Sequence, residues 1–273
     1  MLTVTVLAEN SANREDMAAE YGLSLFLEFE DSVILFDTGQ SDAFLRNAEV
    51  LGCNLERVTD IVLSHGHYDH STGLQYALDW FRRHRPDNPP RLITHPDSLA
   101  ERFWTSPKGK VMPIGMPEAS KKALRDYPLV LSREPLRISE RIVFLGEVPR
   151  PRPELAALLG DLEHPDSGVP DQILDDSGLA FITPKGLMLV LGCGHAGVVN
   201  IVEHARAVTG ADHVHSILGG LHLAHAPRKM IEQTLEYAHE RRVERLYGCH
   251  CTGSALAHSP LQRNIGTGDV LVL

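Results

Sequence analysis

A cluster of imidazole and carboxylate side chains follows an apolar segment early in the chain. The segment Val58–Ser64 (VTDIVLS) is rich in β-branched and apolar residues, which predicts a buried strand. Directly after it, four potential metal ligands stand within six positions: His65, His67, Asp69 and His70. A lone histidine is usually a surface or core residue, but a sharply turning loop at a strand end can aim several side chains at one point. The sequence therefore predicts a metal site at this end of the strand.

Three further histidines occupy comparable positions in the second half. His195 follows LMLVLGCG, His222 follows SILGGL and His250 follows RLYGC. Each stands just beyond an apolar run, where the end of a strand would present it at an edge shared with the first cluster. We therefore add His195, His222 and His250 to the candidate ligands.

The order of apolar and polar segments predicts an α/β fold. Strands are expected at 2–9, 58–64, 213–220 and 245–251, hairpins within 22–39 and 178–194, and helices at 41–52, 73–84, 198–210 and 227–243. Two strand-rich halves, each with helices able to cover an outer face, indicate two packed sheets flanked by helices.

The middle of the chain differs from both halves. Fourteen of the 17 prolines fall between Pro86 and Pro170, and proline interrupts both helices and sheets. We expect an irregular proline-rich insertion at about 86–170 within one domain spanning 1–273. It is either a surface excursion or a lid over the site, since long loops in compact domains are often functional.

Composition limits the classes of partner. The net charge of −10 argues against nucleic acid or an anionic membrane as the main partner. The apolar runs are too short to span a bilayer, and the N-terminus lacks the pattern of a secretory signal. Four cysteines in 273 residues do not form a disulfide framework, so we expect reduced thiols and a cytoplasmic protein. The predicted partner is a small molecule, and the oligomeric state is open.

Four lysines stand close together in the middle segment of this otherwise acidic chain: Lys108, Lys110, Lys121 and Lys122. They form either a solvated basic surface or, with Arg150, contacts to a phosphate of the substrate.

One motif resembles a nucleotide site. GCGHAG (192–197) matches G-x-G-x-x-G between a strand and a helix, but the next strand ends in glycines rather than in the acidic residue that a dinucleotide fold requires. We interpret these glycines as permitting a tight turn that lets His195 reach the metal.

These residues together resemble the metallo-β-lactamase superfamily. Its H-x-H-x-D-H motif is matched by His65, His67, Asp69 and His70, and ILFDTG resembles its strand-end aspartate, here Asp37. The segments GLSLFLE, FDTGQSD, GEVPR, GCGHAGVVN, GGLHL and HCTG are similar to its dihydropterin synthase-like branch. Two departures from the branch, Gly194 in place of serine and Ser71-Thr72-Gly73 in place of Thr-Gly-Gly, remove no ligand.

The resemblance implies an αββα sandwich of two mixed sheets flanked by helices, with two metal ions at the sheets' common edge. His65 and His67 would bind one ion, and Asp69 and His70 the other. His195 and His250 would complete the two sets, with His222 as a further ligand or a substrate contact. Asp37 would accept a hydrogen bond from a ligand imidazole.

A bridging ligand is not evident from the sequence. The superfamily usually places an aspartate between its two ions, and three residues of this chain are candidates for that position: Cys193, Asp175 and Asp176.

Imidazole and carboxylate ligands suit zinc, which we favour, and also iron or manganese. Two such ions about 3.5–4 Å apart can activate water against an ester or stabilise a departing phosphate group. The resemblance suggests transfer of a dihydropterin from its pyrophosphate to an aminobenzene ribofuranosyl phosphate, with Asp69 and Asp37 as catalytic residues. The alternatives are a dinuclear-metal hydrolase of esters and a non-catalytic metal-binding sensor.

Overall fold

The computed structural model describes residues 1–106, 108–156, 161–162 and 170–273. Within these residues the strands form two large mixed sheets and one small antiparallel sheet. No helix in the described parts of the chain is long and apolar enough to cross a membrane.

The first sheet has the strand order β16-β1-β2-β3-β4-β5-β8 in the described residues. Its strands are β1 (Leu2–Ala8), β2 (Ser24–Phe29), β3 (Ser32–Phe36), β4 (Asp60–Val62), β5 (Arg91–Thr94), β8 (Leu129–Leu131) and β16 (Val270–Val272). The strands from β16 to β3 pair antiparallel, and those from β3 to β8 pair parallel.

The second sheet has the order β15-β14-β13-β12-β10-β9. Its strands are β9 (Leu136–Ser139), β10 (Ile142–Phe144), β12 (Gly178–Thr183), β13 (Gly186–Leu191), β14 (Val214–Gly220) and β15 (Arg245–Cys249). Strands β13, β14 and β15 are parallel, and the others pair antiparallel.

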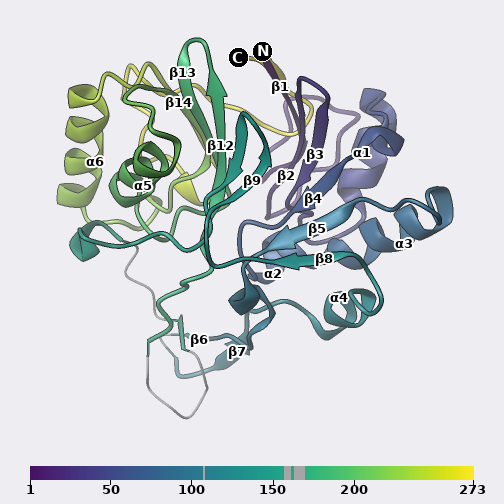
Figure 1. Ribbon diagram of the computed structural model, residues 1–273. Helices are drawn as coiled ribbons and strands as arrows, with labels where there is room; N and C mark the ends of the chain where they lie inside the picture. The colour runs from purple at the N-terminus through teal and green to yellow at the C-terminus, as the bar shows by residue number, and fades with distance from the viewer. Residues whose placement is uncertain (107, 157–160, 163–169) are drawn as a thin grey trace.

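Helices form the two outer layers (Figure 1). The α-helices of the described residues are α1 (Ala43–Leu51), α2 (Tyr68–Ser71), α3 (Leu74–His84), α4 (Glu118–Ala123), α5 (Val198–Thr209) and α6 (Arg228–Glu240). Helices α1 and α3 cover the first sheet, and α5 and α6 cover the second. The predicted four-layer arrangement of helices on both sides of two mixed sheets is confirmed.

The main core lies between the sheets. Its buried side chains come from both, and Phe29 of β2 meets Phe181 of β12 with ring centroids 5.4 Å apart. Two further apolar clusters join each sheet to its own helices. Apolar side chains are buried on both faces of each sheet. The sequences of the strands are therefore mostly continuous apolar runs and show little alternation of apolar and polar residues.

The segment 86–170 contains more regular structure than its sequence predicts. Strands β5 and β8 extend the first sheet, and β9 and β10 extend the second. Each has only three or four residues, too few for a periodicity to be recognised. The prolines lie beside these strands, as Pro128 before β8 and Pro135 before β9 do, so they do not interrupt the hydrogen bonding.

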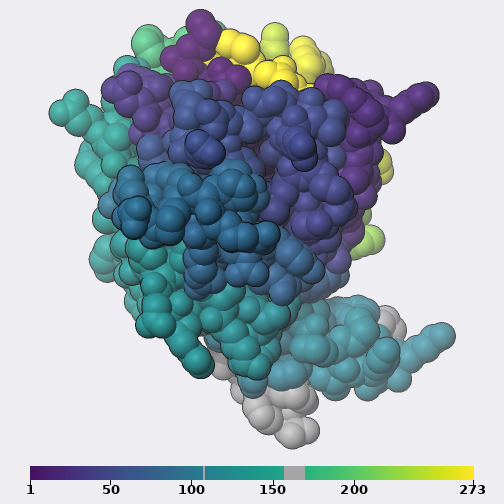
Figure 2. Space-filling view, turned by 90° about the vertical axis from the view of Figure 1, so that its right-hand side faces the viewer, coloured from purple at the N-terminus to yellow at the C-terminus, as the bar shows by residue number. Residues whose placement is uncertain are grey.

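The same segment also builds the small sheet of β6 (Phe103–Thr105), β7 (Val111–Pro113) and β11 (Asp161–Leu162). Strands β6 and β7 project from the body of the molecule, as Figures 1 and 2 show from two directions. Residues 107, 157–160 and 163–169 lie outside the described residues, and the predicted lid falls partly on them.

Candidate metal centre

The candidate ligands follow the ends of parallel strands. His65 comes three residues after β4, His195 four after β13, His222 two after β14, and His250 directly after β15. The carboxyl ends of parallel strands meet at one edge of a sheet, and the two sheets pack face to face. The sequence pattern therefore brings side chains from both halves to a common edge.

Two groups of three donor atoms form there. The ligand atoms within each group lie within 4.8 Å of one another; the groups are His65, His67 and His195 (group 1) and Asp69, His70 and His250 (group 2). All six side chains are buried. His222 lies beside group 1, with its ring centroid 4.4 Å from that of His195.

The separations between donor atoms suit a tetrahedral ion. The Nε2 atoms of His65 and His195 are 3.3 Å apart, and those of His70 and His250 are 3.2 Å apart. His250 Nε2 lies 3.2 Å from Asp69 Oδ2. Two nitrogens bound tetrahedrally to zinc at about 2.0–2.1 Å stand about 3.3–3.4 Å apart. Each group therefore has the spacing of ligands around one ion.

Asp37 lies behind both groups. It stands just after β3, is fully buried, and its Oδ2 lies 2.7 Å from His70 Nδ1. The same oxygen accepts a hydrogen bond of 2.7 Å from the Ser64 hydroxyl, whose oxygen lies 2.9 Å from His65 Nδ1. Since Ser64 donates to Asp37, it accepts from His65. Both imidazoles thus carry their proton on Nδ1 and present the Nε2 lone pair to the centre.

Asn10 supports His250 in the same way. Its Oδ1 accepts a hydrogen bond of 3.2 Å from Gly22 N and lies 2.9 Å from His250 Nδ1, which assigns the proton of that ring to Nδ1. Glu9 accepts a hydrogen bond of 2.8 Å from the backbone N–H of His250. Sequence reasoning missed both residues. The available signal was their position at the end of β1, where two polar residues follow an apolar strand.

This arrangement calls for a cation. His70 and His250 each direct Nδ1 to an acceptor, so their Nε2 lone pairs face each other at 3.2 Å. Two lone pairs at this distance repel unless a proton or a metal ion lies between them. Burial opposes a charge on His70, but the carboxylates of Asp69 and Asp37 outweigh it and raise its pKa to about 9. This raised pKa favours a positive charge at His70, in agreement with a cation between the two rings.

Burial favours the neutral form of the group 1 imidazoles. Burial, reinforced by the neighbouring imidazoles, holds the pKa of His65 and of His195 well below the usual value. Burial also lowers the pKa of His67 to about 4. Neutral imidazole is the form that binds metal.

Of the three candidates for a bridging ligand, the structure brings Cys193 alone to the centre. Its thiol forms groups within the same 4.8 Å limit with members of both donor groups, and Sγ lies 3.1 Å from His70 Nε2. Asp176 accepts a hydrogen bond from Ala196 N, and burial raises its pKa to about 6.

Asp175 is engaged by Arg102 instead. The guanidinium of Arg102 donates to both oxygens of Asp175, at 2.9 and 2.7 Å, and to Asp171 at 2.5 Å. Asp175 Oδ2 also accepts a hydrogen bond of 2.8 Å from Gly66 N, within the histidine motif. All three charged side chains are buried. The ion pair therefore fixes the backbone between His65 and His67, a role that the sequence did not reveal.

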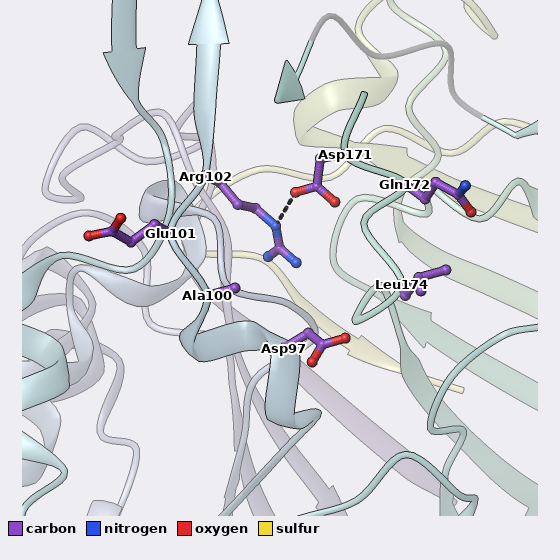
Figure 3. A pocket seen from close by; sticks show the side chains of 7 residues that line it. All are labelled: Asp97, Ala100, Glu101, Arg102, Asp171, Gln172 and Leu174. Atoms are coloured by element: carbon purple, nitrogen blue, oxygen red, sulfur yellow. Dashed lines mark hydrogen bonds and ion pairs between the residues drawn. The ribbon is translucent and has the colours of Figure 1, made fainter. Parts of the chain in front are cut away.

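A cavity of about 500 Å³ runs along this ion pair (Figure 3). Arg102 points toward Asp171, while Glu101 points away on the other side. Its lining combines the carboxylates of Asp97, Glu101 and Asp171 with Arg102, whose guanidinium is already paired with Asp171 and Asp175.

The backbone of the centre is constrained. Asp37, His222 and His250 all have positive φ, at 54°, 50° and 51°. Such conformations in residues other than glycine are uncommon and concentrate at functional sites. Gly192 passes so close to Ser64 that a Cβ atom would lie 2.0 Å from its hydroxyl oxygen. This glycine of the GCGHAG motif therefore permits the contact between Ser64 and Asp37.

A second cavity, of about 420 Å³, lies beside α2, which carries Asp69 and His70. Tyr68 of α2 and Thr72, directly after it, line this cavity. The lining also includes the apolar Phe103 and Met116, the basic Arg102 and Lys121, and the carboxylates of Glu101 and Glu118. Its volume is in the range of small-molecule sites, which combine apolar walls with a few polar groups.

The other basic candidates do not line this cavity. Lys108 and Lys110 are exposed around the turn between β6 and β7. Lys122 is 69% exposed beside Glu118, and Arg150 donates to the carbonyl oxygens of Gln172 and Ile173. All four cysteines are free thiols, as predicted.

Comparison with known proteins agrees with this geometry. The family model of the metallo-beta-lactamase superfamily matches residues 18–250. The 7,8-dihydropterin-6-methyl-4-(beta-D-ribofuranosyl)-aminobenzene-5'-phosphate synthase of Methanocaldococcus jannaschii is 30% identical over 267 residues, covering 92% of this chain and 88% of the relative. An uncharacterised protein of the same organism is 29% identical, covering 92% of this chain and 90% of that protein.

Solved structures share the fold. A metal-dependent hydrolase of the beta-lactamase superfamily aligns with a TM-score of 0.83 at 25% identity, over 100% of this chain and 99% of its own. Zinc-bound PqqB from Methylobacterium extorquens aligns with a TM-score of 0.56 at 13% identity, over 99% of this chain and 100% of its own, a likeness of fold alone.

Proposed function

The chain belongs to the metallo-beta-lactamase superfamily, and from this membership we propose that it is a two-metal enzyme acting on a phosphorylated small molecule. The observation that carries the proposal is the pair of donor groups, His65/His67/His195 and Asp69/His70/His250, at one edge of the two sheets. Zinc is the ion that we favour, because the donors are mostly imidazoles at tetrahedral spacing.

Within this class we propose transfer of a dihydropterin from its pyrophosphate to an aminobenzene ribofuranosyl phosphate. The support is the 30% identity to the Methanocaldococcus synthase, which extends over 88% of that protein. Two bound ions would supply Lewis-acid stabilisation for the negative charge on the departing pyrophosphate.

The chain's own residues have distinct parts in this proposal. Asp37 orients the imidazole of His70 directly and that of His65 through Ser64. Asp69 supplies the anionic donor of group 2. The cavity between Tyr68, Phe103 and Met116 would hold an aromatic ring of the substrate, with Lys121 near a phosphate. Apolar walls there would also exclude water, which competes with the acceptor.

Hydrolysis of an ester is the second candidate. A structural relative aligned over the whole chain is a metal-dependent hydrolase, and the same donors would serve water as the nucleophile.

The test is incubation of metal-loaded protein with hydroxymethyl-dihydropterin pyrophosphate, with and without an aminobenzene acceptor, followed by mass spectrometry. Acceptor-dependent coupling with release of pyrophosphate supports the transferase. Acceptor-independent loss of phosphate supports a hydrolase instead.

A matched variant tests the role of the metal donors. Asp69→Asn removes the anionic donor of group 2 and should abolish either activity. Elemental analysis should find up to two transition-metal ions per wild-type chain. Full activity in Asp69→Asn, or wild-type protein that takes up no metal, would refute the two-metal proposal.

A further inference from the structure

Cys193 stands between the two donor groups. Its Sγ forms close groups with His65 and His70, with His195 and His222, and with His250 and Cys251. The side chain is only 3% exposed, and its Sγ lies 3.1 Å from His70 Nε2. No carboxylate in the described chain has comparable access to both groups among the clusters of metal-binding side chains.

The two buried aspartates nearby belong to none of these groups of ligand atoms. Both oxygens of Asp175 accept hydrogen bonds from Arg102, and one also accepts from Gly66 N. Asp176 accepts from Ala196 N through Oδ2, and its Oδ1 has no hydrogen-bond partner among the described residues, but no oxygen of Asp176 joins the histidine groups. Moving Asp175 to the centre would leave the buried Arg102 with fewer partners, which is costly for a charge inside a protein.

The neighbouring cysteine does not take the same position. Cys251 donates its thiol hydrogen to the backbone carbonyl of Cys193, 3.3 Å away, so this thiol has a partner in the protein. Cys251 also lacks the close groupings with His65, His70 and His195 that Cys193 has among the described residues. Cys193 is therefore the sulfur atom placed to contact both groups.

We propose that Cys193 is the ligand shared by the two metal ions, so that a thiolate links them where a carboxylate would otherwise be needed. The proposal rests on the two-metal function proposed above. Its chemical consequence is selectivity: a thiolate favours zinc and disfavours magnesium and manganese, which prefer oxygen donors.

The test uses cobalt(II) in place of the native ion. Cobalt bound to a thiolate gives an intense near-ultraviolet charge-transfer band that imidazole and carboxylate ligands do not give. Metal-free protein is titrated with cobalt, and the spectrum and the number of bound ions are measured for the wild type, Cys193→Ser, Cys193→Asp and the control Cys251→Ser. Circular dichroism checks folding.

We expect the band in the wild type and in Cys251→Ser, and its loss in both Cys193 variants. Cys193→Asp should still bind two ions, because a carboxylate can bridge them, whereas Cys193→Ser should lose the second ion. Two results would overturn the assignment of Cys193 as the shared ligand. One is a charge-transfer band that persists in Cys193→Asp. The other is a band that is lost in Cys251→Ser but retained in Cys193→Ser.

A measurement on the wild type alone keeps the proposal testable if the variants do not fold. X-ray absorption at the zinc edge should show a sulfur neighbour at about 2.3 Å. Two bound zinc ions without a sulfur neighbour would refute the thiolate and leave the two-metal function standing. Protein that binds neither cobalt nor zinc would overturn both.

Discussion

Replacing Arg102 by methionine tests whether the buried ion pair behind the histidine motif stabilises the protein. Arg102 donates to Asp175 at 2.9 and 2.7 Å and to Asp171 at 2.5 Å, and all three side chains are at most 9% exposed. Methionine fills a similar volume without the charge, so two buried carboxylates lose their counter-charge. Removing one partner of a buried ion pair costs about 3–5 kcal/mol.

The assay is thermal and urea unfolding of the metal-free protein. For a chain of this size each kcal/mol corresponds to about 2–4 °C in Tm, so Arg102→Met should lower Tm by roughly 10 °C. Arg133 provides a matched control, because it also pairs with two carboxylates, Asp97 and Glu147, but is half exposed. Arg133→Met should unfold close to the wild type, since solvent screens exposed pairs.

Metal binding gives a second measurement on the same variants. Asp175 holds Gly66 N, between His65 and His67, so releasing it should weaken metal binding at group 1. Equal Tm values for Arg102→Met and Arg133→Met would refute the energetic reasoning. A lowered Tm with unchanged metal affinity would refute the link to the motif.

Three other changes follow from the same contacts. Ser64→Ala removes the hydroxyl between His65 and Asp37 and should weaken metal binding about 10–100-fold, measured by competition with a chelator. Asn10→Ala releases Nδ1 of His250 and should have an effect of similar size; unchanged affinity in either variant would contradict the assigned tautomers. Lys121→Met should raise KM for a phosphorylated substrate about tenfold at unchanged metal content, whereas Lys122→Met, outside the cavity, should not; equal KM values would remove Lys121 from the substrate site.

The candidate ligands could be recognised from sequence because each follows its own strand. His65, His67, Asp69 and His70 form one local motif, and the later histidines each stand just beyond an apolar run. Residues that act across the fold leave no such local pattern. Asn10 meets His250 across 240 positions, and Arg102 meets Asp175 across 73. Their partners are determined only once the two sheets have packed.

For the fold, too, the sequence predicted the elements that have a local pattern and missed those that are too short to have one or that depend on long-range pairing. Long hairpins and amphipathic helices were identified, since each has enough residues to show a period. Strands β5, β8, β9 and β10 were not, because three or four residues show no period. The strand partners of β5 and β8 are distant in sequence, whereas β9 and β10 pair with each other as a short hairpin. β16 was missed for the same reason; it pairs with β1 at the opposite end of the chain.

Some of the residues that hydrogen-bond the candidate ligands serve both donor groups, and others serve one group. Asp37 contacts His70 of group 2 directly and reaches His65 of group 1 through Ser64, so one buried carboxylate orients imidazoles of both groups. Asn10, in contrast, contacts His250 of group 2. Loss of Ser64 should therefore act first on the ion of group 1, and loss of Asn10 on that of group 2. If Cys193 is the ligand shared by both ions, the two losses would be coupled. When one ion leaves its group, the Cys193 thiolate loses one of its two metal partners, and binding of the ion in the other group changes as well.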